Sequence, residues 1–260
     1  MKSGILSARH PSPVTRHREM NKCADGIYMI GRYGNPLCAT WLLEANGECA
    51  IVEMPPFIRR QNRPVEYIKD FIKEEGLKGP KYILCSHSHL DHTYSIFHYK
   101  KAFPKAKLLG HTSFFNDYFI KSFFYIYWTR NKRIYGEKIA NHKGLFDEVF
   151  STDFYQIDIG GEPVYLIYAP KHSYEDLMIV FKGTMITGDW TIGPYPDCND
   201  IVTPEDKIAS IDKLIYIMDN LDYKIYRLFS VHGDNFMYDV NFEAVMKETR
   251  DFCLTERESL

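Results

Sequence analysis

The stretch SHSHLDHTYS, residues 86–95, places three histidines and one aspartate within a few positions: His87, His89, Asp91 and His92. A strand puts positions 87, 89 and 91 on one face and 92 on the other, whereas a helix pairs only 87 with 91 and 89 with 92. A strand end that turns into a helix start would gather all four. Neutral imidazoles and a carboxylate are ligands of zinc and related cations, so this stretch predicts a metal site.

Three more candidate ligands stand at or just past the end of an apolar run. His172 follows YLIYAPK, Asp189 closes TMITGD, and His232 closes RLFSVH. With the first motif they make seven ligands, which suffice for two cations. A natural partition gives one cation His87, His89 and His172 and the other Asp91, His92 and His232, with Asp189 bridging them.

The elements that must position these residues are mostly strands. Short apolar runs predict strands at 26–31, 38–45, 48–54, 81–85, 106–111, 163–170, 177–189 and 225–232, with hairpin turns at Asn46-Gly47 and Lys182-Gly183. Helices are predicted over 64–75, which begins with a proline and is followed by Gly76, and over 203–219, with Thr203 as N-cap and Asp206 at N3. This order predicts two sheets covered by helices.

Composition is that of a soluble enzyme-sized chain. A net charge of −2 over 260 residues gives no bulk attraction to nucleic acid or to an anionic membrane. The six cysteines are scattered without a C-x-x-C pair, so we expect free thiols and a cytoplasmic protein. Residues 1–22 are basic and lack the apolar segment of a secretory signal, and we expect a disordered tail ahead of one domain over 23–260.

The order of motifs resembles the metallo-β-lactamase fold superfamily: H-x-H-x-D-H, a histidine after a strand, T-G-D, and a final histidine. The resemblance spans about residues 23–235. It implies an α/β (α+β) fold, the αββα four-layer sandwich with two mixed sheets flanked by helices. It also implies a dinuclear site at one edge, usually of zinc, with the ligand partition given above. Iron and manganese are alternatives, because imidazole and carboxylate suit them almost equally.

Several positions depart from the usual pattern without removing a ligand. Tyr94 stands in a stretch where relatives have small residues, Lys171 replaces a glycine before the third-motif histidine, and Glu53 occupies the place of an early aspartate. Tyr94 and Lys171 are expected to reshape the mouth of the site. For Glu53, a supporting place behind a ligand and a plain solvated position are both open.

The predicted chemistry is hydrolysis of a small molecule. Zinc lowers the pKa of bound water from about 16 to roughly 7, so a hydroxide held between two cations could attack an ester, thioester or lactone carbonyl. Asp91 is the expected catalytic residue, which orients the attacking water and carries its proton to the leaving group.

Three rival functions are weighed against hydrolysis. Di-iron proteins of this fold that react with oxygen or nitric oxide resemble H-x-E-x-D-H, with a carboxylate where this chain has His89. A nuclease of the same superfamily is disfavoured by the neutral charge balance. A binding protein with a dead site is disfavoured because all seven ligand positions are filled.

Two aromatic residues are candidate substrate contacts. Tyr195, in IGPYPDC, could overhang the cations, although packing beside its neighbouring prolines is the simpler interpretation. Trp128 belongs to an aromatic-rich insertion at about 112–150, in which three- and four-residue spacings over 113–139 predict a helix. That helix would pack on the sandwich, cover the site, or form a homodimer surface.

Overall fold

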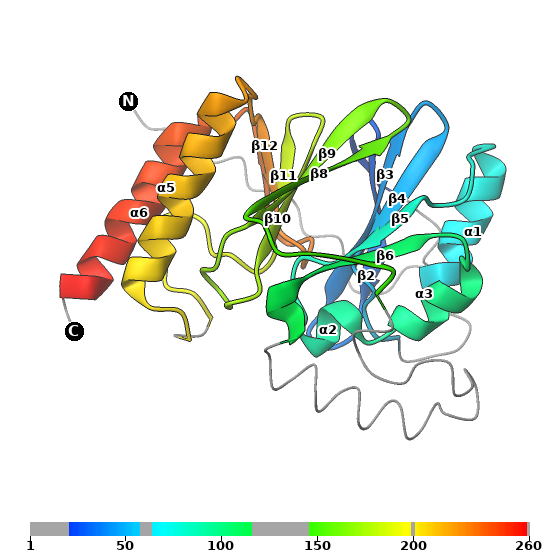
Figure 1. The fold of residues 1–260 in the computed structure, drawn as a ribbon, viewed down its shortest axis with the longest axis horizontal. Coiled ribbons are helices and arrows are strands. Elements are labelled where there is room, and N and C mark those ends of the chain that lie inside the picture. The colour runs from blue at the N-terminus through cyan, green and yellow to red at the C-terminus, as the bar shows by residue number, and fades with distance from the viewer. Residues whose placement is uncertain (1–20, 58–63, 116–145, 199–200, 259–260) are drawn as a thin grey trace.

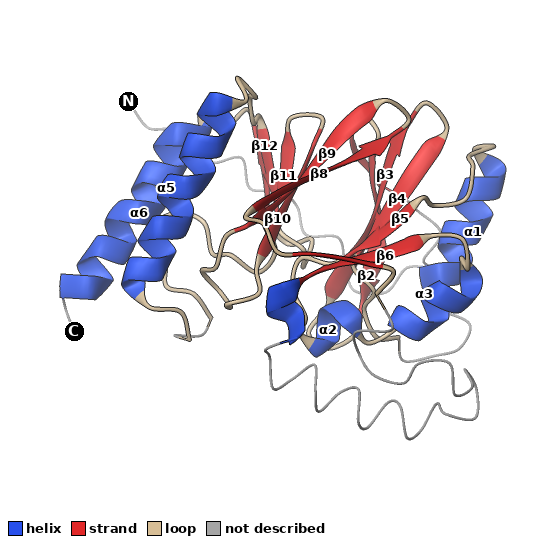
Figure 2. Ribbon diagram, in the orientation of Figure 1, coloured by secondary structure: helices blue, strands red, loops and turns tan. Residues whose placement is uncertain are grey.

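The computed structural model describes residues 21–57, 64–115, 146–198 and 201–258 of the chain. It contains two sheets packed face to face around an apolar core, with helices on the outer face of each (Figures 1 and 2). This is the four-layer αββα arrangement that the sequence predicts. Among the described residues, no helix combines the length and the apolar character needed to cross a membrane.

The first sheet has seven strands in chain order. They are β1 (Asn21–Ala24), β2 (Ile27–Tyr33), β3 (Cys38–Ala45), β4 (Glu48–Val52), β5 (Tyr82–Leu84), β6 (Lys107–His111) and β7 (Glu148–Phe150). The early strands are antiparallel, and β4, β5, β6 and β7 run parallel to one another. Asn46 and Gly47, both at positive φ, close the predicted hairpin between β3 and β4.

The second sheet has six strands, in the order β13-β12-β11-β10-β9-β8. Their bounds are β8 (Phe154–Ile159), β9 (Glu162–Tyr168), β10 (Leu177–Phe181), β11 (Thr184–Ile186), β12 (Arg227–Phe229) and β13 (Phe236–Tyr238). Strands β9 and β11 are each antiparallel to β10, and β12 is parallel to β11. The carboxyl ends of β9, β11 and β12 therefore reach the same edge of this sheet.

Helices α1 (Pro64–Glu74), α2 (Leu90–Thr93) and α3 (Ile96–Ala102) accompany the first sheet, and α5 (Pro204–Asn220) and α6 (Phe242–Glu258) cover the second (Figure 1). Helix α5 begins as predicted, because the Thr203 side chain accepts a hydrogen bond from the Asp206 backbone N–H. The second sheet is buried on both faces. Alternate residues of β10, such as Ile179 and Val180, belong to the core between the sheets and to the core under α5 and α6, respectively.

The structure adds elements that the sequence patterns did not predict: β1, β7, β8, β13, α3 and α6. It also shortens two predicted strands. The run 177–189 leaves regular pairing after β11, and the run 225–232 is a strand only over β12, so Asp189 and His232 lie on loops.

Most of the aromatic insertion, residues 116–145, lies outside the described ranges, and so does Trp128. Of this segment the structure gives the 3-10 helix η2 (Thr112–Phe115) and strand β7. The side chains of Phe114 and Phe115 are buried.

The β3–β4 turn of the first sheet contacts the β8–β9 turn of the second sheet. The Asn46 side-chain amide donates to the Gly160 carbonyl at 2.6 Å, and Gly160 itself has φ +59°. A Cβ added at Gly160 would lie 2.1 Å from the Ala45 carbonyl oxygen, whereas one added at Gly161, also at positive φ, would meet nothing within 4 Å. Of these two glycines, Gly160 alone combines a left-handed backbone with a close approach between the sheets.

This pair of glycines gives a matched test of the contact. Gly160→Ala and Gly161→Ala both carry the left-handed penalty of about 1–2 kcal/mol. Gly160→Ala adds a backbone clash, and we expect it to lower the free energy of unfolding by a further ~1–3 kcal/mol. Urea unfolding of both variants measures the difference, and equal losses would show that the two turns are not in rigid contact.

Candidate metal centre

The first motif lies at the carboxyl end of β5, where the chain turns into α2. Ser86 and His87 follow the strand, and His89 keeps an extended backbone (φ −58°, ψ 154°) as the residue before α2. Asp91 and His92 then lie on the first helical turn. This strand-to-helix turn is the geometry that the spacing of the four residues predicts.

The other three site residues come from the second sheet. His172 follows β9, Asp189 follows β11 and His232 follows β12, so all three lie at the edge where these strands end. The centre therefore sits on the seam between the sheets, and the structure brings all seven predicted residues together.

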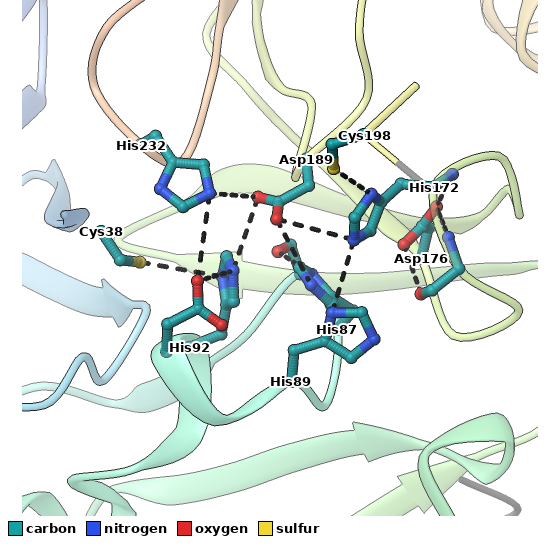
Figure 3. Close-up of polar contacts among 12 residues, drawn as sticks. Cys38, His87, His89, His92, His172, Asp176, Asp189, Cys198 and His232 are labelled. Atoms are coloured by element: carbon teal, nitrogen blue, oxygen red, sulfur yellow. Dashed lines mark hydrogen bonds and ion pairs between the residues drawn. The ribbon is translucent and has the colours of Figure 1, made fainter. Parts of the chain in front are cut away.

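These residues form two groups (Figure 3). His87, His89 and His172 each offer a ring nitrogen, and these atoms lie within 4.8 Å of one another. Asp91, His92, Asp189 and His232 form a second group by the same measure. The two groups correspond to the predicted partition, and their binding of cations stays a prediction.

Asp189 belongs to the second group, and its carboxylate also faces the first group. Its Oδ2 is 3.8 Å from His87 Nε2 and 3.6 Å from His172 Nε2. Its Oδ1 is 3.4 Å from His92 Nε2 and 3.1 Å from His232 Nε2. One oxygen thus faces each group, which is the arrangement of a bridging carboxylate.

Several candidate ligand atoms of the centre are buried and lack a hydrogen-bond partner, which suits the binding of a cation. His87 Nε2, His92 Nε2 and Asp189 Oδ1 are buried, and none has a well-aligned hydrogen bond among the described residues. A buried polar atom without a partner costs about 1–3 kcal/mol. Converging imidazole lone pairs and a carboxylate would satisfy this requirement by binding divalent cations, so the residues fit the metal that the family implies.

The electrostatics of the centre favour positive charge. Burial raises the pKa of the Asp189 carboxyl, but the neighbouring His92 and His87 outweigh burial and hold it well below its usual range. Burial also opposes a charge on His92, yet Cys38, Asp189 and Glu53 raise its pKa well above the ordinary value. Burial lowers the pKa of His87. The carboxylate is therefore ionised, and its surroundings attract a cation.

Glu53 supports His92 from behind. Its Oε2 lies 3.1 Å from His92 Nδ1, and its Oε1 accepts a hydrogen bond from the Ser86 backbone N–H at 2.8 Å. The side chain is fully buried, so the alternative of a solvated glutamate is wrong. A carboxylate on the far nitrogen of a histidine directs the other nitrogen toward a cation.

Asp176 organises the loop that carries His172. Its carboxylate accepts hydrogen bonds from the backbone N–H groups of Lys171 (3.0 Å), His172 (2.7 Å) and Ser173 (2.9 Å), and from the Trp190 indole (3.1 Å). Trp190 follows Asp189 directly, so one buried carboxylate joins the two loops. Burial raises the pKa of Asp176 to about 6, which leaves it ionised above pH 7.

Two supporting cysteines were not predicted. Cys38 Sγ lies 3.7 Å from His92 Nδ1, and Cys198 Sγ lies 3.2 Å from His172 Nδ1. Both cysteines lie far in sequence from the histidines that they contact, so sequence patterns give no sign of either contact. Tyr195 is 61% exposed on the loop between Asp189 and Cys198, and its contact with a substrate stays a prediction.

Comparison with known proteins identifies the family. A family model described as the metallo-beta-lactamase superfamily matches residues 56–219, more than half of the chain. The chain belongs to the metallo-β-lactamase superfamily. No curated protein matches the sequence.

Solved structures of metallo-β-lactamases share its fold. A metallo-beta-lactamase family protein from Thermus thermophilus is 17% identical, with a TM-score of 0.58 over 91% of this chain and 82% of that one. The metallo-beta-lactamase GOB-18 from Elizabethkingia meningoseptica is 14% identical, with a TM-score of 0.56 over 99% and 100%. One from Pontibacter korlensis is 12% identical, with a TM-score of 0.59 over 91% and 98%. At these identities the likeness establishes the fold alone.

The role of Asp176 can be tested on the metal-free protein. Asp176→Asn replaces one carboxylate oxygen with an amide that cannot accept, and at pH 8 we expect a loss of about 1.5–3 kcal/mol in the free energy of unfolding. Asp70→Asn, at an exposed position on α1, is the control and should change it by less than about 0.5 kcal/mol. Equal stability of both variants in urea would show that Asp176 does not hold the loop.

Proposed function

We propose that this metallo-β-lactamase superfamily member is a dinuclear metal-dependent hydrolase of small carbonyl compounds: esters, thioesters, lactones or related acyl compounds. The observation that carries the proposal is the position of Asp189, whose two carboxylate oxygens face different ligand groups. His87, His89 and His172 would hold one cation, and Asp91, His92 and His232 the other. Zinc is the metal we propose, with iron and manganese as alternatives.

The cations, when bound, would lower the pKa of a coordinated water toward neutrality and act as Lewis acids toward the substrate carbonyl. Asp91 is suited to move the proton. Its side chain is 19% exposed, and its Oδ2 lies 3.4 Å from His92 Nε2 and 4.0 Å from His232 Nε2. Burial raises its pKa, but the neighbouring His92 outweighs burial and lowers the pKa below its ordinary value, so Asp91 is ionised at neutral pH. It can accept a proton from water and donate it to the leaving group.

More residues of the second group than of the first are open to solvent, which indicates where substrate enters. In the first group the side chains of His87 and His172 are 0% and 4% exposed and His89 is half-buried. In the second group His92 is buried, whereas Asp91 and His232 are 19% and 20% exposed. We therefore propose that a small molecule approaches from the side of Asp91 and His232. The six cysteines are all free, as is typical of a reducing compartment, and we propose the cytoplasm as the location.

The proposal is tested by metal content and a substrate panel. Protein expressed in medium with zinc and iron should hold two metal ions per chain by elemental analysis. The panel should contain a thioester, a lactone, a simple ester, a β-lactam and a phosphodiester, and we expect hydrolysis of at least one carbonyl substrate. Trace metal only, or cleavage of the phosphodiester alone, would overturn the proposal; the second result would favour the nuclease. Bound iron with consumption of oxygen or nitric oxide and no hydrolysis would favour the di-iron alternative.

Asp189→Asn tests the bridge. The amide lacks the negative charge and offers a single acceptor oxygen, so we expect the second metal to be lost and turnover to fall by at least about a hundredfold, within the range that removal of supporting or ligating groups produces. Asp234→Asn, on the exposed turn after His232, is the control. Circular dichroism should show that both variants are folded. Turnover at the wild-type rate in Asp189→Asn would show that Asp189 does not bridge two cations.

A further inference from the structure

The loops that carry His172 and Asp189 are joined by two neighbouring side-chain pairs. Lys171 Nζ donates to Asp197 Oδ1 at 2.6 Å, and one residue further along each loop Cys198 Sγ lies 3.2 Å from His172 Nδ1 (Figure 3). Two consecutive residues on one loop therefore contact two consecutive residues on the other. The second contact reaches a predicted ligand directly.

The first pair is a fixed point in the fold. Lys171 and Asp197 side chains are each 1% exposed, and the ammonium also donates to the Thr191 carbonyl at 2.8 Å. Lys207 Nζ lies 3.3 Å from the other Asp197 oxygen, so the carboxylate is paired on both sides. Breaking such a buried pair is strongly unfavourable, because it leaves an uncompensated charge. The position of Cys198, the next residue, is thereby set.

The contact with Cys198 bears on the tautomer of His172. The ring can offer Nε2 to a cation only when the proton of the neutral imidazole is on Nδ1. Nδ1 then needs an acceptor, and Cys198 Sγ is at hydrogen-bond distance for sulfur. With that proton on Nε2 instead, the lone pair would point at the thiol and away from the Asp189 side of the ring. When a cation occupies Nε2, Cys198 Sγ is therefore placed to accept the Nδ1–H and to hold the ring in this orientation.

We propose that Cys198 is a positioning residue for His172, which holds its Nδ1–H and directs Nε2 toward the centre, and that the Lys171–Asp197 ion pair fixes Cys198 for this role. This inference rests on the metal-binding part of the proposed function. Lys171 serves this arrangement because its ammonium forms the ion pair.

Zinc affinity tests the positioning role. In competition with a chromophoric chelator, Cys198→Ala should still bind two zinc ions, one of them about tenfold more weakly, the lower end of the range for supporting groups because sulfur is a weak acceptor. Cys198→Ser restores an acceptor and should bind close to the unchanged chain. Cys23→Ala, at a half-buried cysteine on β1, is the control and should leave both affinities unchanged.

A second readout follows the Nδ1 proton of His172 in the zinc-loaded protein. Proton–nitrogen correlations of the imidazoles should show a slowly exchanging His172 Nδ1–H in the unchanged chain and in Cys198→Ser, and faster exchange of this proton in Cys198→Ala. Asp197→Asn should weaken zinc binding in the same direction as Cys198→Ala. Equal zinc affinity in Cys198→Ala and the unchanged chain, or equal exchange of the His172 Nδ1–H in both, would overturn the inference alone. An unchanged chain that binds none of zinc, iron and manganese would overturn the proposed function and this inference together.

Discussion

The Asp189 carboxylate is the constraint on which the centre depends. It is ionised and largely buried, and it touches imidazoles from both ligand groups. An ion in this position is stable only if positive charge surrounds it, and the surrounding rings come from both sheets. The two sheets must therefore keep a fixed position relative to each other at the centre. The close contact of the turns near Gly160 and the apolar core between the sheets hold them in that position.

Supporting groups behind the ligands differ in chemical kind. His92 leans on the buried Glu53 carboxylate, His172 on the Cys198 thiol, and His232 Nδ1 lies 2.6 Å from the Leu37 carbonyl oxygen. A carboxylate, a thiol and a carbonyl differ in their strength as acceptors, so the three rings are not equivalent as ligands. We therefore expect the three imidazoles to differ in basicity, because each has a different supporting partner behind it.

Much of the fold and the ligand set could be predicted from the sequence, because both are written in local patterns. Apolar runs ending in histidine or aspartate marked the strand ends, and the Asn46-Gly47 turn marked a hairpin that the structure confirms. Among the supporting residues, the sequence left the role of Glu53 open and did not predict Cys198 or Asp176. Cys198 and Asp176 act across sequence gaps of 26 and 14 residues, on His172 and Trp190 respectively, so their partners follow only from tertiary structure. Strand β8 and helix α6 are exceptions, because their periodicity is local and visible in the sequence.

The placement of the seven residues along the chain has a consequence for biosynthesis. Strand β9 precedes α5, and β12 follows it, so the three-imidazole group is complete in sequence at His172 while the other group waits for His232. Domains emerge from the ribosome amino-terminal end first. A nascent chain therefore carries every residue of the three-imidazole group before it carries His232, which completes the second group.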